Sequence, residues 1–156
     1  MKLWPSREHT IVTGFTKADL LTRIANYTQE VGSAFITEKP LFNGKVSENG
    51  FRISTVVKTP QNALPLIIGQ LEETSHGSIL FLKMKLFPAA VLFLRAFTLL
   101  SVVIGMILFL MANLRLAGLI SFGLGALNYL ILTTNFHKHA QRSVSQLEEL
   151  LEGPKQ

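Results

Sequence analysis

The sequence predicts an α+β protein with membrane helices: a small antiparallel sheet of about four strands plus one helix, then a transmembrane helical hairpin and a C-terminal amphipathic helix. Two observations predict this class. Polar and apolar residues alternate with period two between Pro40 and Leu86, as in half-buried strands. The chain then becomes strongly apolar, because Arg115 is the only charged residue between Ala96 and Leu132. We therefore divide the chain into residues 1–86, 88–133 and 134–156.

The composition of the chain excludes several kinds of protein. A length of 156 residues suits one ordinary domain, and the absence of cysteine excludes disulfides and thiolate chemistry. The first ten residues, MKLWPSREHT, contain no apolar run and no lipidation motif, so we expect neither a secretory signal peptide nor a lipid anchor. The net charge of +5 comes from scattered basic residues, so we expect no nucleic-acid partner.

The N-terminal part is expected to hold a short strand near HTIVTG (9–14) and then a helix from Thr16 to Glu30. Thr16 is a favourable N-cap, and Asp19 three residues later gives a capping-box-like pair near the positive end of the helix dipole. Gly32 is suited to end this helix. Its apolar face holds Leu20, Ile24, Tyr27 and Val31.

Four strands are expected between Leu41 and Leu86. The first two flank the turn SENG (47–50) as an antiparallel hairpin. The third strand opens at Pro65, and the turn TSHG (74–77) joins it to the fourth. The fourth strand presents two faces, with Leu82, Met84 and Leu86 on one and Lys83 and Lys85 on the other.

The apolar stretch from Ala96 to Leu132 predicts two membrane spans rather than one. As a single helix it would be roughly 55 Å long at about 1.5 Å per residue, against a hydrocarbon core of about 30 Å. We therefore expect a tight helical hairpin with spans at about 88–112 and 116–133. Asn113 and Arg115 then belong at the turn, level with the lipid head groups.

Basic residues near the span ends predict the orientation of the hairpin. The turn carries Arg115 alone, whereas the side of the termini carries Lys83, Lys85, Arg95, Lys138 and Arg142. We therefore expect both termini in the cytoplasm. Lys83 and Lys85 are placed to meet anionic lipid head groups, with two solvated strand lysines as the alternative. Arg95 is expected to snorkel to the head groups, and the alternative is a buried functional charge.

Both spans carry small or polar residues along one helix face. The set comprises Thr98, Ser101, Gly105 and Ala112 in the first span, and Gly118, Ser121, Gly125 and Asn128 in the second. Small residues let helices approach closely in lipid. We expect the two faces to pack on each other inside the hairpin, and the alternative is that one face also drives self-association. Asn128 is expected to join the helices by hydrogen bonding.

The polar tail, residues 134–156, reads as an amphipathic helix that Gly153 and Pro154 end. Its apolar positions are Phe136, Ala140, Val144, Leu147 and Leu151. We expect this helix either to pack back on the sheet or to continue the second span. Binding of a partner protein is the alternative.

Short motifs in the strands carry a resemblance to a known group of proteins. They are Phe42-x-Gly44-x-Val46, Phe51-x-Ile53 and Asn62-x-x-Pro65-x-x-x-Gly69. Together with the hairpin, they resemble the F-x-G-x-V, F-x-I and N-S-F-x-P-x-x-x-G strands of small uncharacterised bacterial membrane proteins with two spans. Ala63 and Leu64 replace the usual Ser-Phe, and the resemblance covers roughly residues 40–132. It implies a bacterial inner-membrane protein and no catalytic residue. The residues themselves suggest bulges or close backbone approach at Gly44 and Gly69.

Residues that could support catalysis are scattered, so we expect no enzyme, no metal and no cofactor. His137 and His139 point to different helix faces, and His9 and His76 fall in expected loops. The one aspartate, Asp19, is explained by capping. The sequence also contains no phosphate-binding loop, dinucleotide fingerprint or nucleophile elbow.

Two functions are compatible with these features. The first is a membrane-anchored scaffold or accessory protein whose sheet binds a protein partner, or its own copies, at the cytoplasmic bilayer surface. The second is a small homo-oligomeric transport or channel component. We prefer the first, because Thr98, Ser101 and Asn128 are few polar residues to line a pathway. Membrane lipids are expected partners in both cases.

Overall fold

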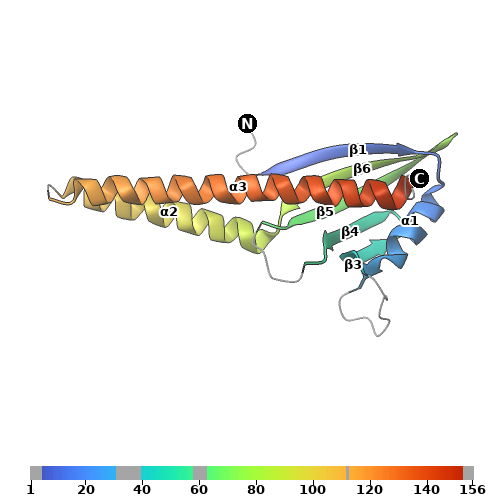
Figure 1. Ribbon diagram of the computed structural model, residues 1–156, viewed down its shortest axis with the longest axis horizontal. Coiled ribbons are helices and arrows are strands. Elements are labelled where there is room, and N and C mark those ends of the chain that lie inside the picture. Colours follow the sequence, from blue (N-terminus) through green and yellow to red (C-terminus); the bar gives the residue numbers. More distant parts are fainter. Residues whose placement is uncertain (1–4, 31–39, 58–62, 112, 153–156) are drawn as a thin grey trace.

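The structure, a computed structural model, describes residues 5–30, 40–57, 63–111 and 113–152. Within these residues it is α+β, with a mixed sheet of six strands and three helices (Figure 1). In chain order the elements are β1 (Ser6–Thr13), α1 (Lys17–Asn26), β2 (Thr28–Gln29), β3 (Phe42–Ser47), β4 (Gly50–Thr55), β5 (Pro65–Thr74), β6 (Gly77–Leu86), α2 (Pro88–Leu110) and α3 (Arg115–Glu152).

The strands lie in the order β1-β6-β5-β4-β3-β2. The sheet has more than the expected four or so strands, because β1 and β2 are added to them. β1 lies where a short strand was expected near residues 9–14. β1 pairs with β6 along its whole length, from Ser6 opposite Lys85 to Thr13 opposite Ser78. The two-residue β2 adds a parallel edge beside β3, where the carbonyl of Tyr27 accepts hydrogen bonds from two backbone N–H groups. A strand that short has no periodicity to detect.

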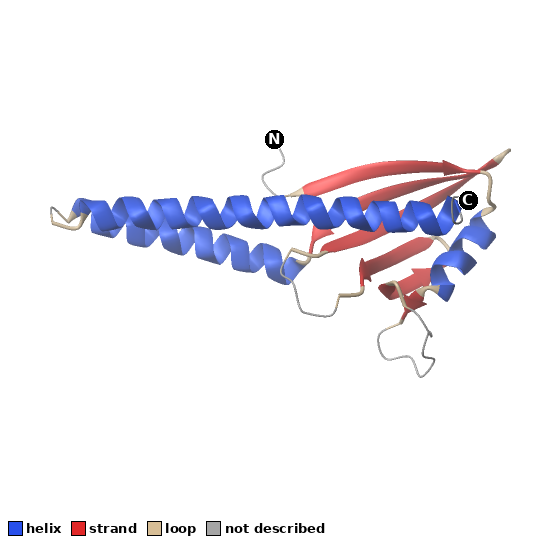
Figure 2. Cartoon of the chain, in the orientation of Figure 1, coloured by secondary structure: helices blue, strands red, loops and turns tan. Residues whose placement is uncertain are grey.

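One face of the sheet, the covered face, packs against α1 and α3. Figure 2 shows both helices on the same side of the strands. Residues that are 0–2% exposed fill this interface: Leu20 and Ile24 of α1, Phe42, Ile53, Ile67, Leu80, Leu82 and Met84 of the sheet, and Phe136, Ala140, Leu147 and Leu151 of α3. All belong to one hydrophobic core. Hydrophobic burial of the covered face is therefore what attaches the helices to the sheet.

The predicted boundary at residue 134 does not interrupt the last helix. α3 continues from Arg115 to Glu152 and is about 57 Å long at about 1.5 Å per residue. Its first part pairs with α2, and its second part lies on the sheet (Figure 1). The two expectations for the tail, packing on the sheet and continuing the second span, are therefore both met by one helix. The hairpin turn lies between α2 and α3, with Asn113 in the turn and Arg115 as the first helical residue.

The helix expected at 16–30 is shorter, because α1 ends at Asn26 and the chain then enters β2. Its predicted cap is present: Thr16 Oγ1 accepts a hydrogen bond from the Asp19 backbone N–H at 3.2 Å and donates one to the Asp19 carboxylate at 2.8 Å. Val31 and Gly32 lie outside the described residues.

The residues behind the family resemblance lie on the covered face. Phe51 and Gly69 are direct partners across β4 and β5, and the Phe51 ring occupies the space where a Cβ of residue 69 would be. A Cβ at Gly44 would lie 2.2 Å from the Arg52 carbonyl oxygen. Both glycines thus permit close approach, as expected. No bulge interrupts the β3–β4 register. Asn62 lies outside the described residues.

Candidate functional site at the base of the hairpin

Small residues of the two long helices face each other inside the hairpin. Ser121 Oγ donates a hydrogen bond to the Ser101 carbonyl oxygen at 3.0 Å. A Cβ on Gly125 would lie 2.9 Å from the Ser101 Cβ, and a Cβ on Gly118 would lie 2.7 Å from the backbone nitrogen of Phe109. Gly105 is covered in the same way by the ring of Phe122. Five residues of the sequence-derived stripe are thus occupied by contacts within one chain: Ser101, Gly105, Gly118, Ser121 and Gly125. The Nδ2 atom of Asn128, which was expected to join the helices, has no acceptor in the described residues.

The outer surfaces of α2 and α3 are exposed and apolar. Both helices are long and apolar enough to cross a membrane, and only 17% of the most apolar window of each is buried. Exposed large side chains run along both helices, among them Leu92, Leu99, Ile107 and Leu110 of α2 and Leu116, Leu119, Leu127 and Leu130 of α3. The core helix of a water-soluble protein would bury such side chains.

The three basic residues expected at the lipid surface lie near the base of the hairpin. Lys83 and Lys85 are exposed on the face of β6 opposite the core, and Arg95 is exposed on α2. Lys83 Nζ lies 3.5 Å from a carboxylate oxygen of Glu8 on β1. The strands run along α3 rather than across its end (Figure 1). Lys85, one residue before the end of β6, is therefore closer to the hairpin than Lys83.

A crevice of about 440 Å³ opens where the hairpin meets the sheet. Its lining consists of Ala63, Phe93, Asn128, Ile131, Leu132, Asn135 and His139. The five residues from α3 follow one helical stripe, since they are spaced by three, one, three and four positions. Phe93 closes the crevice from α2, and Ala63 closes it from the segment just before β5. Sequence analysis identified Asn128 but missed the crevice, because its walls come from three separate parts of the chain.

Three polar side chains line this crevice, those of Asn128, Asn135 and His139. Asn128, nearest the hairpin turn, has a buried Nδ2 atom without a hydrogen-bond acceptor in the described part of the chain. Outside the crevice lining, the buried Oγ1 atoms of Thr98 and Thr133 also have no hydrogen-bond partner in the described part of the chain. His139 lies beside the sheet, beyond the apolar part of α3. Burial, and then the neighbouring Arg142 guanidinium, lower the pKa of His139 below its usual value, so the imidazole is neutral near pH 7.

Two polar contacts tie α3 to the sheet. His9 Nε2 lies 3.0 Å from Glu148 Oε1, and the hydroxyls of Thr55 and Ser143 are 2.7 Å apart. His9 lies in strand β1, where a loop was expected. These contacts fix how α3 lies on the covered face, and neither contains a nucleophile next to a base.

The other histidines have separate local partners. His137 Nδ1 lies 2.8 Å from the Thr133 carbonyl oxygen, and His76 Nδ1 lies 2.8 Å from Ser75 Oγ in the turn between β5 and β6. Within the described residues, no three His, Asp or Glu side chains gather to hold a metal ion.

Comparisons with known proteins identified no relative. No family model, curated protein or solved structure matches the chain. The resemblance to small two-span bacterial membrane proteins therefore stays a prediction.

Proposed function

We propose that this chain is an integral protein of the bacterial cytoplasmic membrane and a non-catalytic scaffold, whose sheet holds a protein partner next to the bilayer. One observation carries the proposal: α3 belongs both to the hairpin and to the core of the sheet domain. A single helix that is packed at both ends transmits position and orientation from the membrane to the sheet. A flexible linker would not fix the orientation of the sheet in this way.

The apolar surface of the hairpin supports insertion in a bilayer. A hydrocarbon core of about 30 Å takes roughly twenty helical residues. Counted back from the turn, this length reaches about residue 91 on α2 and about residue 134 on α3. The core of the sheet domain begins at this level, because Leu94 and Phe136 are both fully buried in it. The sheet domain thus starts where the hydrocarbon ends.

Charge supports an orientation with both termini in the cytoplasm. Lys85, Lys138 and Arg142 lie around the base of the hairpin, and Arg115 alone lies at its tip. Basic residues are enriched on the cytoplasmic side of membrane helices.

The face of the sheet opposite the core, the open face, supports a protein partner with an acidic surface. Register places Glu8, Lys83, Ile68, Arg52 and Lys45 in one row across the strands β1, β6, β5, β4 and β3. With Lys85 in the next row, this face carries four cations and two strand carboxylates, Glu8 and Glu72. Lys83 lies 3.5 Å from Glu8, and Lys45 lies 4.0 Å from Glu30, just after β2. Val12 and Phe81 add exposed apolar surface. Complementary charge would steer an acidic partner to this face.

The hairpin contacts argue against the channel alternative. A pathway between several hairpins needs polar groups on their outer surfaces. Ser101, Gly105, Gly118 and Gly125 are instead packed inside one hairpin, which leaves little polar surface in the spans for such a pathway.

Single cysteines test the topology, because the natural chain has none. We expect a membrane-impermeant maleimide to label Asn113→Cys, in the hairpin turn, from outside intact spheroplasts. His76→Cys, in the β5–β6 turn, should react only after lysis. Labelling of both positions from the same side, or full solubility of the chain without detergent, would contradict the proposal.

Photo-crosslinking in cells tests the partner. A photoreactive residue at Gln70, exposed on the open face, should capture a heterologous protein, and Arg52→Glu should reduce this capture because it reverses a neighbouring charge. Lys138→Glu reverses an exposed charge on α3 and serves as the matched control, which should leave capture unchanged. Capture of only the same chain, through a photoreactive residue at lipid-facing Leu99, would support the channel instead.

A further inference from the structure

We infer that the outer edge of β1, the side of this strand away from β6, binds an extended polypeptide segment as an added strand of the sheet. β1 is the outermost strand in the order β1-β6-β5-β4-β3-β2, so it pairs with β6 on one side only. We rest this on the protein partner and the membrane orientation proposed above. The carrying observation is a row of backbone hydrogen-bonding groups along the outer edge.

The register of the strands identifies which backbone groups face outward. The turn between β5 and β6 has two residues, so the pair of residues that closes it is hydrogen bonded. Hydrogen-bonded pairs alternate along an antiparallel ladder. Ser78, one residue after that pair, therefore directs its backbone groups at β1 and bonds its partner Thr13. The Thr13 carbonyl oxygen indeed lies against the position of a Cβ at Gly77, on the β6 side. By the same alternation, Thr10 and Val12 direct their N–H and C=O groups outward.

The outward backbone groups of Thr10 and Val12 have no hydrogen-bond partner among the described residues. Val12 is also 76% exposed. Natural edge strands usually prevent strand addition with charges, proline or a bulge. Residues 10–13, Thr-Ile-Val-Thr, are instead uncharged and β-branched, and their register with β6 is continuous. A row of alternating donors and acceptors is satisfied by another extended backbone, as in the binding of peptides to sheet edges.

A second copy of the chain does not fit this edge. β1 runs along α3 (Figure 1), so a symmetry axis along the membrane normal is roughly parallel to β1. An antiparallel pair of equivalent strands needs a two-fold axis perpendicular to them, which would point one hairpin away from the bilayer. A two-fold axis parallel to the strands would bring N–H groups level with N–H groups, and no ladder would form. The opposite edge, β2, has only two residues. The added strand therefore comes from a different protein.

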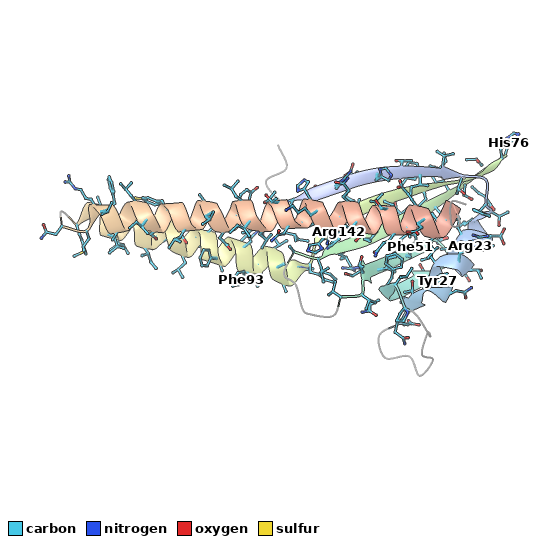
Figure 3. All side chains as sticks on the ribbon, in the orientation of Figure 1. Arg23, Tyr27, Phe51, His76, Phe93 and Arg142 are labelled. Atoms are coloured by element: carbon cyan, nitrogen blue, oxygen red, sulfur yellow. The ribbon has the colours of Figure 1, made fainter. Side chains whose placement is uncertain are left out.

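The uncharged half of β1 lies away from the bilayer. Figure 3 shows His76 at the end of the sheet farthest from the hairpin, whereas Phe93 lies on the hairpin. Thr13 is paired with Ser78, two residues after His76, so this half of the strand ends near the distant turn. An extended segment of a cytoplasmic protein region can thus reach residues 10–13 without entering the lipid head groups.

The side chains beside the outer edge indicate which segment it would take. On the open face, Val12 lies opposite Ile79 and Thr10 lies opposite the exposed ring of Phe81. An added strand would place one side chain next to Val12 and another next to Thr10. Aromatic and β-branched residues form the favourable cross-strand pairs with such neighbours. The expected ligand is therefore an extended segment with β-branched or aromatic residues at every second position.

Selection from a random peptide library tests the edge in the full chain. Nine-residue peptides displayed on phage are selected against the chain in nanodiscs, and empty nanodiscs serve for counter-selection. We expect enrichment of peptides with β-branched or aromatic residues at alternate positions. One enriched peptide is then synthesised with N-methyl groups on either of its two alternating sets of backbone nitrogens. Methylation of the set that faces β1 should weaken binding by about tenfold or more, and methylation of the other set should have little effect.

Two substitutions at one position of β1 provide the matched control. Thr10→Pro removes an outward N–H group, at a place where an edge strand tolerates proline, and should weaken binding of the enriched peptide by about tenfold. Thr10→Val keeps the N–H group and should bind like the natural chain. Thermal unfolding of both variants in the same detergent reports on the fold. The methylated peptides test the edge independently of whether Thr10→Pro folds.

The edge and the open face can fail separately. Equal effects of the two methylation patterns, or no enrichment above empty nanodiscs, would overturn strand addition. Arg52→Glu should leave peptide binding unchanged, although it should reduce capture of the partner at Gln70. Capture at Gln70 without peptide binding would overturn the edge site alone. Peptide binding without any capture at Gln70 would overturn the partner proposed for the open face and leave the edge site in place.

Discussion

The Phe51 ring lies over Gly69 because the two residues are direct partners on the covered face of adjacent strands. Phe51 is 4% exposed and belongs to the same core as α3. A glycine opposite a large aromatic residue gives the ring space to lie flat against the sheet, so that the helix can pack above it. Two residues of the family-like motifs thus have one shared structural role, which is to shape the core.

Gly69→Ala should destabilise the fold by about 1–3 kcal/mol, as expected for overpacking. Its Cβ would lie 2.2 Å from Phe51 Cζ, and the buried ring has little room to move. Gly14→Ala is the control, because nothing lies within 4 Å of a Cβ at that position. Thermal unfolding of the two variants in the same detergent measures the difference. Equal melting temperatures would show that Phe51 can be displaced freely.

At the scale of elements, the α2–α3 pair explains why small residues recur in both spans. Lipid tails are as apolar as the helices, so association depends on close packing rather than on the hydrophobic effect. Buried Ser101 and Gly105 on α2 meet Gly118, Ser121 and Gly125 on α3. This contact accounts for the stripe without a second copy of the chain.

Gly125→Leu should therefore separate the two helices and lower the melting temperature in detergent. Its side chain would collide with Ser101, because a Cβ on residue 125 would lie 2.9 Å from the Ser101 Cβ. Gly123→Leu is the matched control on the same helix, because a Cβ there meets nothing within 4 Å. Blue-native gels of both variants report on assembly. Loss of an oligomer in Gly125→Leu, with unchanged melting temperature, would instead assign the stripe to self-association.

At the scale of the whole molecule, α3 makes the division into a sheet domain and a hairpin incomplete. The six strands of the described residues lie between Ser6 and Leu86, but Phe136, Ala140, Leu147 and Leu151 of α3 cover their apolar face. A sheet with such a face exposed aggregates or binds whatever apolar surface is near. The sheet therefore depends on a helix that reaches it only after two passes along the hairpin.

A chain ending at Leu86 should consequently not fold. We expect it to be insoluble or to bind a dye specific for exposed apolar surface. Replacing residues 88–133 by a flexible soluble linker, so that residues 134–152 can still pack on the sheet, should restore a dispersed NMR spectrum. A well-folded 1–86 fragment would contradict the structural role that we assign to the second half of α3.

The sequence by itself determined the features that depend on local patterns. Periodicity and turn chemistry, which neighbouring residues specify, account for four features: the Thr16–Asp19 cap, the turns at 47–50 and 74–77, the two faces of β6, and the division into polar and apolar parts.

Tertiary structure alone decided the features that depend on distant partners. β1 carries polar His9 on the covered face because Glu148, far away in the sequence, pairs with it, so alternation failed to reveal this strand fully. α3 continues through the expected boundary because its apolar residues pack on α2 at one end and on the sheet at the other. The crevice exists only where three separate parts of the chain meet. Local patterns specify which groups a segment must bury, whereas the folded chain determines what covers them.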